Sequence, residues 1–264
     1  MSERVRYEVR ETERVAIVTL ARPEKRNALD PQTIAELEEA LAAAEADGRV
    51  SAILLAADGR DFCAGADLEH IERTVDMSPE DLKADALTLG RLFVHMRRLP
   101  KPIVAAVHGN ALAGGAGLAT ACDLVAASDD AHFGYPEVRI GFVPAMVMTM
   151  LVRAVGEKRA FALVALGHRI GAREALEQGL VHTVFSRHTF ADDAFALAAD
   201  LAARSRTSVA LTKRLLYELD ELTFEEGIER GADVNAEARG TDDCRSGVRA
   251  FLAARRPSVE PEAR

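Results

Sequence analysis

The chain has 264 residues, of which 48% are hydrophobic and 28% charged, and its formal net charge is −9. This composition is typical of a globular protein with one large core, and the acidic balance argues against a general nucleic-acid or membrane surface. The longest apolar run, residues 143–152, is about half of the ~20 residues that a membrane-spanning helix needs. The charged N-terminus lacks the apolar segment of a signal peptide, and the scattered cysteines have neither disulfide nor zinc spacing. We therefore expect a cytoplasmic protein without a metal site.

The first part of the chain reads as strands and helices in alternation. Strands are predicted over residues 5–9, 15–20 and 52–57. Between the last two strands, Asp30 and Pro31 supply a helix N-cap and a proline at the first helical position, and Gly48 ends that helix. A short loop, residues 58–67, then leads into a helix that begins near Asp67.

The alternation continues and then gives way to helices. Ser78 and Pro79 begin a helix that runs to about residue 98. A strand over residues 102–107, a glycine-rich turn with a helix, and a strand over residues 123–128 follow. From Pro144 onward the pattern is mostly helical, with one strand near residues 180–185. The order of elements predicts an α/β core with a helical C-terminal part.

The segment HGNALAGGAGLATACD, residues 108–123, contains four glycines. A strand, a glycine-rich turn and a helix in succession present backbone N–H groups to an anion at the helix N-terminus. A dinucleotide fingerprint is only nearly matched, because the helix is short and no acidic residue follows ~20 positions on, and the lysine of a phosphate-binding P-loop is missing. Close packing of a helix on a strand and an oxyanion hole made of backbone donors remain open.

Two further segments favour the oxyanion hole. DFCAGADL, residues 61–68, is a second small-residue turn between a strand and a helix, so it offers another backbone donor; Asp67 in it is the expected N-cap. In HFGYPEVRIGFVP, residues 132–144, Glu137 lies among apolar residues and is a candidate for a partly desolvated carboxylate. The basic loop RPEKRN, residues 22–27, is either a solvated loop or an anion site.

Four segments, in this order and spacing, resemble the enoyl-CoA hydratase/isomerase (crotonase) superfamily: RPEKRNAL, FCAGADL, HGNALAGGAGLATACDLVAAS and FGYPEVRIGFVP. The resemblance covers almost the whole chain and is greatest to bacterial enoyl-CoA hydratases with a single motif glutamate. It implies an α/β fold with a crotonase-like ββα spiral core, residues 1–200. A helical C-terminal region, residues 201–264, would build homotrimers, often paired as hexamers.

The resemblance also implies an acyl-CoA thioester as the substrate, with no separate cofactor. In this family two backbone N–H groups hold the thioester oxygen, and they correspond to those of Ala66 and Gly114. Glu137 corresponds to an acid/base glutamate. Contacts with CoA are implied for Arg22, Lys25, Arg26, Ala28, Ala64, Asp67 and Leu68. The glycine-rich turn is then bare because side chains would block the approach of the thioester to the backbone donors.

One departure from the family pattern concerns the second glutamate of typical hydratases, which aligns with Gly117 here. A side chain at this position is expected to point toward the thioester. A single carboxylate can take a proton from water and then protonate Cα. It can equally take a proton from C2 of a 3-enoyl thioester and return it at C4. We expect hydration of a 2-enoyl-CoA; isomerisation of a 3-enoyl-CoA and hydration of a methylglutaconyl-type thioester are the alternatives.

Other residues near the motifs are open to two interpretations. His108, His132 and Tyr135 are candidates for a substitute proton carrier, or else make structural hydrogen bonds. Asp123 is expected to be structural. A non-catalytic CoA-binding protein of the same fold is the alternative from a different class of function.

Overall fold

A six-stranded sheet forms the centre of the structure, a computed structural model that describes residues 4–255. The strands follow the order β1-β2-β3-β4-β6-β9, in which β1 and β2 are antiparallel and every other neighbouring pair is parallel. Their bounds are β1 Val5–Arg10, β2 Val15–Leu20, β3 Ala52–Ala57, β4 Ile103–Val107, β6 Leu124–Ser128 and β9 Thr183–Phe185. Because β2, β3 and β4 are parallel, the loops that leave their carboxyl ends emerge at one edge of the sheet.

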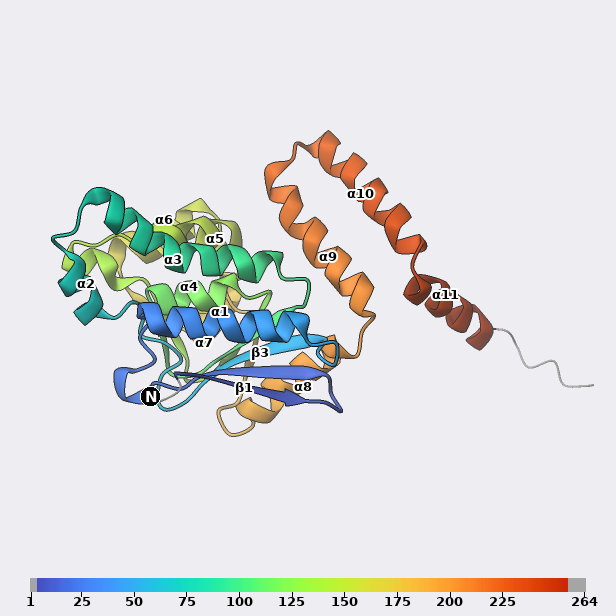
Figure 1. Cartoon of the computed structure of the whole chain (residues 1–264), viewed down its shortest axis with the longest axis horizontal. Coiled ribbons are helices and arrows are strands. Elements are labelled where there is room, and N and C mark those ends of the chain that lie inside the picture. Colours follow the sequence, from blue (N-terminus) through green and yellow to red (C-terminus); the bar gives the residue numbers. More distant parts are fainter. Residues whose placement is uncertain (1–3, 256–264) are drawn as a thin grey trace, which may run out of the picture. The chain divides into compact units, whose positions relative to one another are not determined.

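Helices cover both faces of this sheet (Figure 1). On one face α1, α3, α4 and α5 contribute to a large apolar core, and on the other face α8 packs with a smaller apolar cluster. The helices of this part of the chain are α1 Pro31–Ala46, α2 Leu68–Thr74, α3 Pro79–Arg98, α4 Gly114–Ala121, α5 Ala145–Val155, α6 Glu157–Leu166, α7 Ala172–Glu177 and α8 Phe190–Ala202.

The predicted helix starts are confirmed by their capping bonds. The Asp30 carboxylate accepts from the Thr33 N–H at 2.9 Å with Pro31 at the first helical position, and the Ser78 hydroxyl accepts from the Asp81 N–H at 3.2 Å. Asp123 accepts from the Ile103 N–H at 2.7 Å, which is the structural role expected for it.

A second, three-stranded sheet is absent from the sequence-based prediction. It is formed by β5 Asn110–Leu112, β7 His132–Gly134 and β8 Arg169–Gly171, in the order β5-β7-β8. Each strand has three residues, which is too short for an alternating pattern to appear. Because β5 pairs with β7, this sheet joins the segment before Glu137 directly to the segment before α4.

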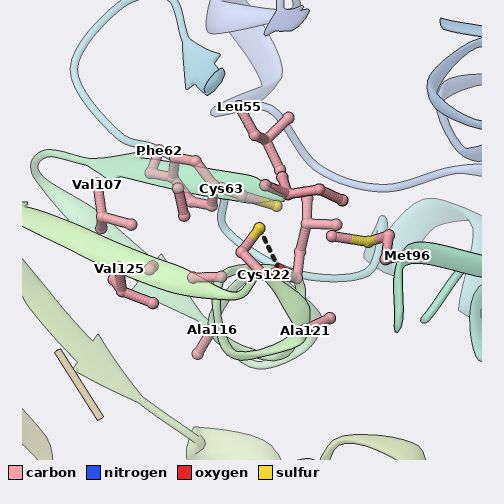
Figure 2. Close-up of a cluster of buried hydrophobic side chains, with 14 of the residues drawn as sticks. Leu55, Phe62, Cys63, Met96, Val107, Ala116, Ala121, Cys122 and Val125 are labelled. Atoms are coloured by element: carbon pink, nitrogen blue, oxygen red, sulfur yellow. Dashed lines mark hydrogen bonds between the residues drawn. The ribbon is translucent and has the colours of Figure 1, made fainter. Parts of the chain in front are cut away.

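The core beside α4 combines large apolar side chains, such as Leu55, Phe62 and Met96, with small residues and two cysteines (Figure 2). Cys122 donates from Sγ to the Leu118 carbonyl at 3.4 Å, and Cys63 donates to the Asn27 carbonyl at 3.0 Å. Burial raises the pKa of the Cys63 thiol to about 12, so the thiol stays protonated and is a packing group rather than a nucleophile.

The chain separates into two compact units, residues 1–203 and 204–264. The second unit contains α9 Arg206–Glu218, the short 3-10 turn η3 Leu219–Glu221, α10 Phe224–Arg239 and α11 Asp242–Ala254. Its helices expose large apolar side chains: Leu216, Leu219, Phe224, Ile228, Val248, Phe251 and Leu252. Within the described residues no helix combines the length and the apolar character needed to cross a membrane.

Ala113, the N-cap of α4, has an unusual backbone conformation with φ 51° and ψ −125°. Glycine adopts this region readily, whereas the Cβ atom of an alanine makes it strained. The hydrogen bonds around the residue hold it there: its N–H donates to the Gly134 carbonyl at 2.8 Å, and its carbonyl accepts from the Gly117 N–H at 3.0 Å.

We therefore expect Ala113→Gly to raise the free energy of unfolding by about 0.5–1 kcal/mol, since it removes the strain. Denaturant titration measures the change. Ala116→Gly is the matched control in the same buried helix, and it should lower the free energy of unfolding by about 1 kcal/mol or more. Equal losses in both variants would contradict a strained Ala113.

Candidate active site

Two loops at the carboxyl edge of the sheet are joined by backbone hydrogen bonds. Residues 22–29 follow β2 and residues 61–68 follow β3. The Ala64 N–H donates to the Arg26 carbonyl at 3.0 Å, the Leu29 N–H to the Gly65 carbonyl at 2.8 Å, and the Asp67 N–H to the Leu29 carbonyl at 2.9 Å. These bonds fix the path of the backbone on both sides of Ala66.

The Ala66 N–H points away from this pairing. Leu29 and Ala66 form a parallel bridge whose hydrogen bonds use the carbonyl before Ala66 and the N–H after it. In a parallel pairing of this kind the central residue directs its own N–H to the opposite side. No acceptor among the described residues takes the Ala66 N–H.

Gly114 brings a second free N–H to the same place. It is the first residue of α4, so its N–H has no partner within the helix, and none is found elsewhere in the described chain. A Cβ atom at position 114 would lie 3.7 Å from the Ala66 nitrogen. The two donors therefore lie side by side, next to the apolar side chains of Leu29 and Leu89.

A close approach of the two glycine-containing turns makes this arrangement possible. A Cβ atom at position 115 would come within 2.7 Å of the Cys63 Cβ, and one at position 65 would come within 3.2 Å of the Gly114 nitrogen. The two interpretations left open by the sequence, close packing and a backbone donor, thus apply to different residues of the glycine-rich turn. Gly115 permits close packing, and Gly114 supplies a donor.

Glu137 is a buried carboxylate with an unsatisfied oxygen. Its side chain lies in the 3-10 turn η2 Pro136–Ile140, is only 8% exposed, and leaves Oε2 without a hydrogen-bond partner among the described residues. Burial raises the pKa of Glu137 above its ordinary value of 4.5. The Gly134 carbonyl is bonded to the residue before Gly114, so the backbone of Glu137, three residues later, is within about 10 Å of that bond.

The candidates for a second proton carrier are engaged elsewhere. Tyr135 is fully buried; burial raises the pKa of its hydroxyl, and its oxygen lies 3.3 Å from the Thr120 hydroxyl. His108 contacts the ring of Phe190 on the α8 side of the sheet, and its Nε2 lies 3.0 Å from the Gly59 carbonyl. His132 is exposed, with Nδ1 3.0 Å from the Asp130 carbonyl.

Val147 fills the direction in which a side chain at position 117 would point. A Cβ atom on Gly117 would overlap Cγ1 of Val147 and would lie 3.3 Å from Cζ of Phe93. Val147 is 3% exposed and belongs to α5, which packs against α4. A glutamate at 117 would therefore have to displace Val147 before it could reach any substrate.

The basic residues of the first loop are all paired with carboxylates. Arg26 donates from Nε to Asp61 at 2.7 Å, Lys25 pairs with Glu69, and Arg22 lies between two aspartates. Lys25 and Arg26 remain about half-exposed, whereas Arg22 is mostly buried.

The remaining residues predicted to meet CoA lie on the paired loops. Ala28 donates from its N–H to the Lys25 carbonyl at 3.1 Å, and Ala64 belongs to the backbone pairing described above. Asp67 caps α2 and accepts from the Glu69 N–H at 3.0 Å, while Leu68 is exposed at the start of that helix.

Comparisons with known proteins show the family of the chain. The sequence profile of the enoyl-CoA hydratase/isomerase family matches residues 10–261. A Thermus thermophilus protein provisionally named enoyl-CoA hydratase is 46% identical over 243 residues, which are 92% of this chain and 96% of that protein. The 2,3-dehydroadipyl-CoA hydratase of Escherichia coli is 34% identical over 250 residues, which are 94% of this chain and 96% of that protein.

A solved enoyl-CoA hydratase of Mycobacterium smegmatis has the same fold, with a TM-score of 0.91 and 32% identity over 97% of this chain and 98% of that one. The chain belongs to the enoyl-CoA hydratase/isomerase family and has its crotonase fold. It is thus an enzyme of a family whose named relatives are hydratases, which are lyases.

The Gly117–Val147 contact can be tested by a thermodynamic cycle. Gly117→Ala should lower the free energy of unfolding by about 1–3 kcal/mol, because it overpacks the contact between α4 and α5. In the Val147→Ala background the same change should be better tolerated, with a coupling of about 0.5 kcal/mol or more. Denaturant titration of the four proteins measures both quantities.

Gly90→Ala is the control for that cycle. A Cβ atom at position 90 of α3 would meet Met146 at an ordinary 3.6 Å, so this change should raise the free energy of unfolding by up to about 1 kcal/mol. Additive effects of the changes at 117 and 147 would contradict the contact.

Proposed function

We propose that the protein is an enoyl-CoA hydratase that adds water across the 2,3-double bond of a 2-enoyl-CoA thioester. The observation that carries the proposal is the pair of unpartnered N–H groups of Ala66 and Gly114, with the buried carboxylate of Glu137 close by in the fold. Backbone donors of this kind stabilise the negative charge that develops on a thioester oxygen.

In the proposed reaction Glu137 carries both protons in turn. Its carboxylate takes a proton from water as the water oxygen bonds to C3, and the electron pair of the double bond moves toward the thioester oxygen. The N–H groups of Ala66 and Gly114 hold the resulting enolate oxygen. The protonated Glu137 then gives its proton to C2, which restores the thioester and the ionised carboxylate. A buried glutamate with a raised pKa suits both roles.

Isomerisation of a 3-enoyl thioester is the second candidate. The observation that favours it is the apolar space between Gly117 and Val147, which leaves no room for a second glutamate at position 117. The other buried carboxylates of the motifs, Asp61 and Asp67, are paired with arginines, so Glu137 is left to carry the proton. In this reaction Glu137 removes a proton from C2, the double bond moves, and the same carboxyl returns the proton to C4. Water takes no part.

Binding of the CoA portion belongs to the same proposal. Lys25 and Arg26 are the half-exposed basic residues beside the paired loops and would meet the phosphates. The backbone of Ala28, Ala64 and Leu68 would follow the rest of the nucleotide and its arm.

The proposal also includes a cytoplasmic location and assembly into a homotrimer or a hexamer. Its free cysteines support a reducing compartment. The exposed apolar side chains of the second unit support association of chains.

Glu137→Gln keeps the shape of the side chain and removes the proton carrier, so it should lower kcat by at least ~10²-fold. The measurement is the turnover of a panel of 2-enoyl and 3-enoyl CoA thioesters, monitored through the loss or gain of the conjugated absorbance. It gives kcat and also separates hydration from isomerisation. Near-normal turnover by the variant would exclude Glu137 as the proton carrier. Turnover of only the 3-enoyl thioesters by the unmodified protein would establish the isomerase.

The same variant has a control that does not depend on turnover. A raised pKa means that ionised Glu137 lowers the free energy of unfolding as the pH rises from about 4.5 through the pKa in the folded protein. Glutamine does not ionise, so the melting temperature of the variant minus that of the unmodified protein should increase between pH 4 and pH 7.

Arg26→Ala tests the binding of CoA phosphates. It should raise the KM of a CoA thioester and have less effect on a thioester truncated to the pantetheine arm, because only the former carries the nucleotide phosphates. Equal losses with both substrates would assign Arg26 a structural role through its pair with Asp61.

A further inference from the structure

Arg22 is the buried member of the basic loop, and within residues 4–255 a single nitrogen of its guanidinium makes the polar contacts of its side chain. Nη1 lies 2.9 Å from Oδ2 of Asp67 and 3.0 Å from Oδ2 of Asp30, and it donates to the Ala28 carbonyl at 3.3 Å. The side chain is 13% exposed. Its charge is thus balanced by two carboxylates, which leaves little for a phosphate.

The two aspartates are the N-caps of two different helices. Asp30 begins α1 and is also paired with Arg4, whereas Asp67 begins α2. Burial opposes ionisation of Asp67, but the hydrogen bond and charge of Arg22, together with hydrogen bonds from the backbone of Glu69 and His70, lower the pKa of that carboxyl. The pKa of Asp30 is likewise lowered, against burial, to about 2 by its hydrogen bonds from Arg4 and Thr33 and the charge of Arg22. Both caps are therefore charged at neutral pH and held by the same guanidinium.

Ala66 lies directly beside this contact. Leu29 and Ala66 form the parallel bridge between the two loops, and Asp30 and Asp67 are the next residue after each bridge partner. Arg22 therefore joins the two strands of the pairing one residue beyond the bridge. A rotation of the peptide between Gly65 and Ala66 would break the hydrogen bond from the Leu29 N–H to the Gly65 carbonyl, and Arg22 ties together the residues that follow in the two loops.

We propose that Arg22 is a positioning residue, whose buried bridge between Asp30 and Asp67 aims the Ala66 N–H at the thioester oxygen, and that it does not bind the CoA phosphates. The inference rests on the proposed function, because it needs Ala66 to be an oxyanion donor. Arg22 acts through Asp67 and the backbone, and it does not touch the substrate.

The experiment compares Arg22→Gln and Arg22→Lys with the matched control Arg49→Gln. Lysine keeps the charge but replaces the planar guanidinium by a strongly hydrated ammonium on a flexible stem, so it should hold the two carboxylates less rigidly. Arg49 also pairs with two carboxylates, Asp47 and Glu11, but near the C-terminal end of α1, about 25 Å from Asp30 by helix length. Thermal unfolding establishes that each protein is folded before it is assayed.

Two readouts distinguish positioning from phosphate binding. In the steady state, Arg22→Gln should lower kcat by ~10-fold or more with little change in KM, and by the same factor for a CoA thioester and a pantetheine thioester. In the Glu137→Gln background, which prevents turnover, the absorbance of bound 3-phenylpropenoyl-CoA should shift to the red in the protein with Arg22. That shift should shrink in both Arg22 variants and persist in Arg49→Gln.

The outcomes separate the possible failures. A raised KM for the CoA thioester alone, with an unchanged red shift, would overturn the proposal and make Arg22 a phosphate ligand. An unchanged kcat and red shift in the folded variants would also overturn it. If Arg22→Gln does not fold, Arg22→Lys decides by the same criteria. Absence of a red shift in the protein with Arg22 would contradict the oxyanion hole itself, and with it the proposed function.

Discussion

The site depends on two backbone N–H groups, those of Ala66 and Gly114, that find no acceptor among the described residues. Buried N–H groups in proteins are nearly always hydrogen-bonded. Around Ala66 the Gly65 carbonyl and the Asp67 N–H are both bonded to Leu29, and before Gly114 the Ala113 N–H is bonded to the Gly134 carbonyl. Three further features serve this arrangement: the bridge at Leu29, the close approach of Gly115 to Cys63, and the strained backbone of Ala113. Each would be unnecessary in a turn that only connected a strand to a helix.

Glu137 is a side chain that, like these N–H groups, is buried without the hydrogen bonds that would stabilise it. A carboxylate at this depth normally gains hydrogen bonds or a cationic partner, as Asp61 does from Asn110 and Arg26. Both carboxyls are buried in the same unit. At Asp61 the hydrogen bonds and charge of these partners outweigh burial and lower the pKa to about 2. At Glu137 burial raises the pKa. The contrast separates a structural carboxylate from one that is suited to proton transfer.

What the sequence could predict follows from the range of the interactions. Capping residues such as Asp30 and Ser78 act within one helical turn, so the helices that they begin were predictable, as were the buried strands. The strands β5, β7 and β8 were not, because three residues carry no period and their pairing joins distant segments. For the same reason the sequence could not predict that Val147 lies opposite Gly117 or that Asp67 pairs with Arg22. Arg22 and Asp67 were each conspicuous in the sequence, but their pairing was not, and Val147 gave no signal at all.

The filled space at Gly117 restricts the geometry of the proposed chemistry. Two carboxylates could approach a thioester from different directions, whereas one carboxylate must receive and return the proton from the position that it occupies. Under the proposed hydration, the water oxygen reaches C3 and the proton reaches C2 from the side where Glu137 lies, so both add to the same face of the double bond. Under isomerisation the proton leaves C2 and returns to C4 on that face as well. In either proposed reaction the position of Glu137 would determine the face, and Val147 leaves no space beside Gly117 for a second carboxylate that could act from another direction.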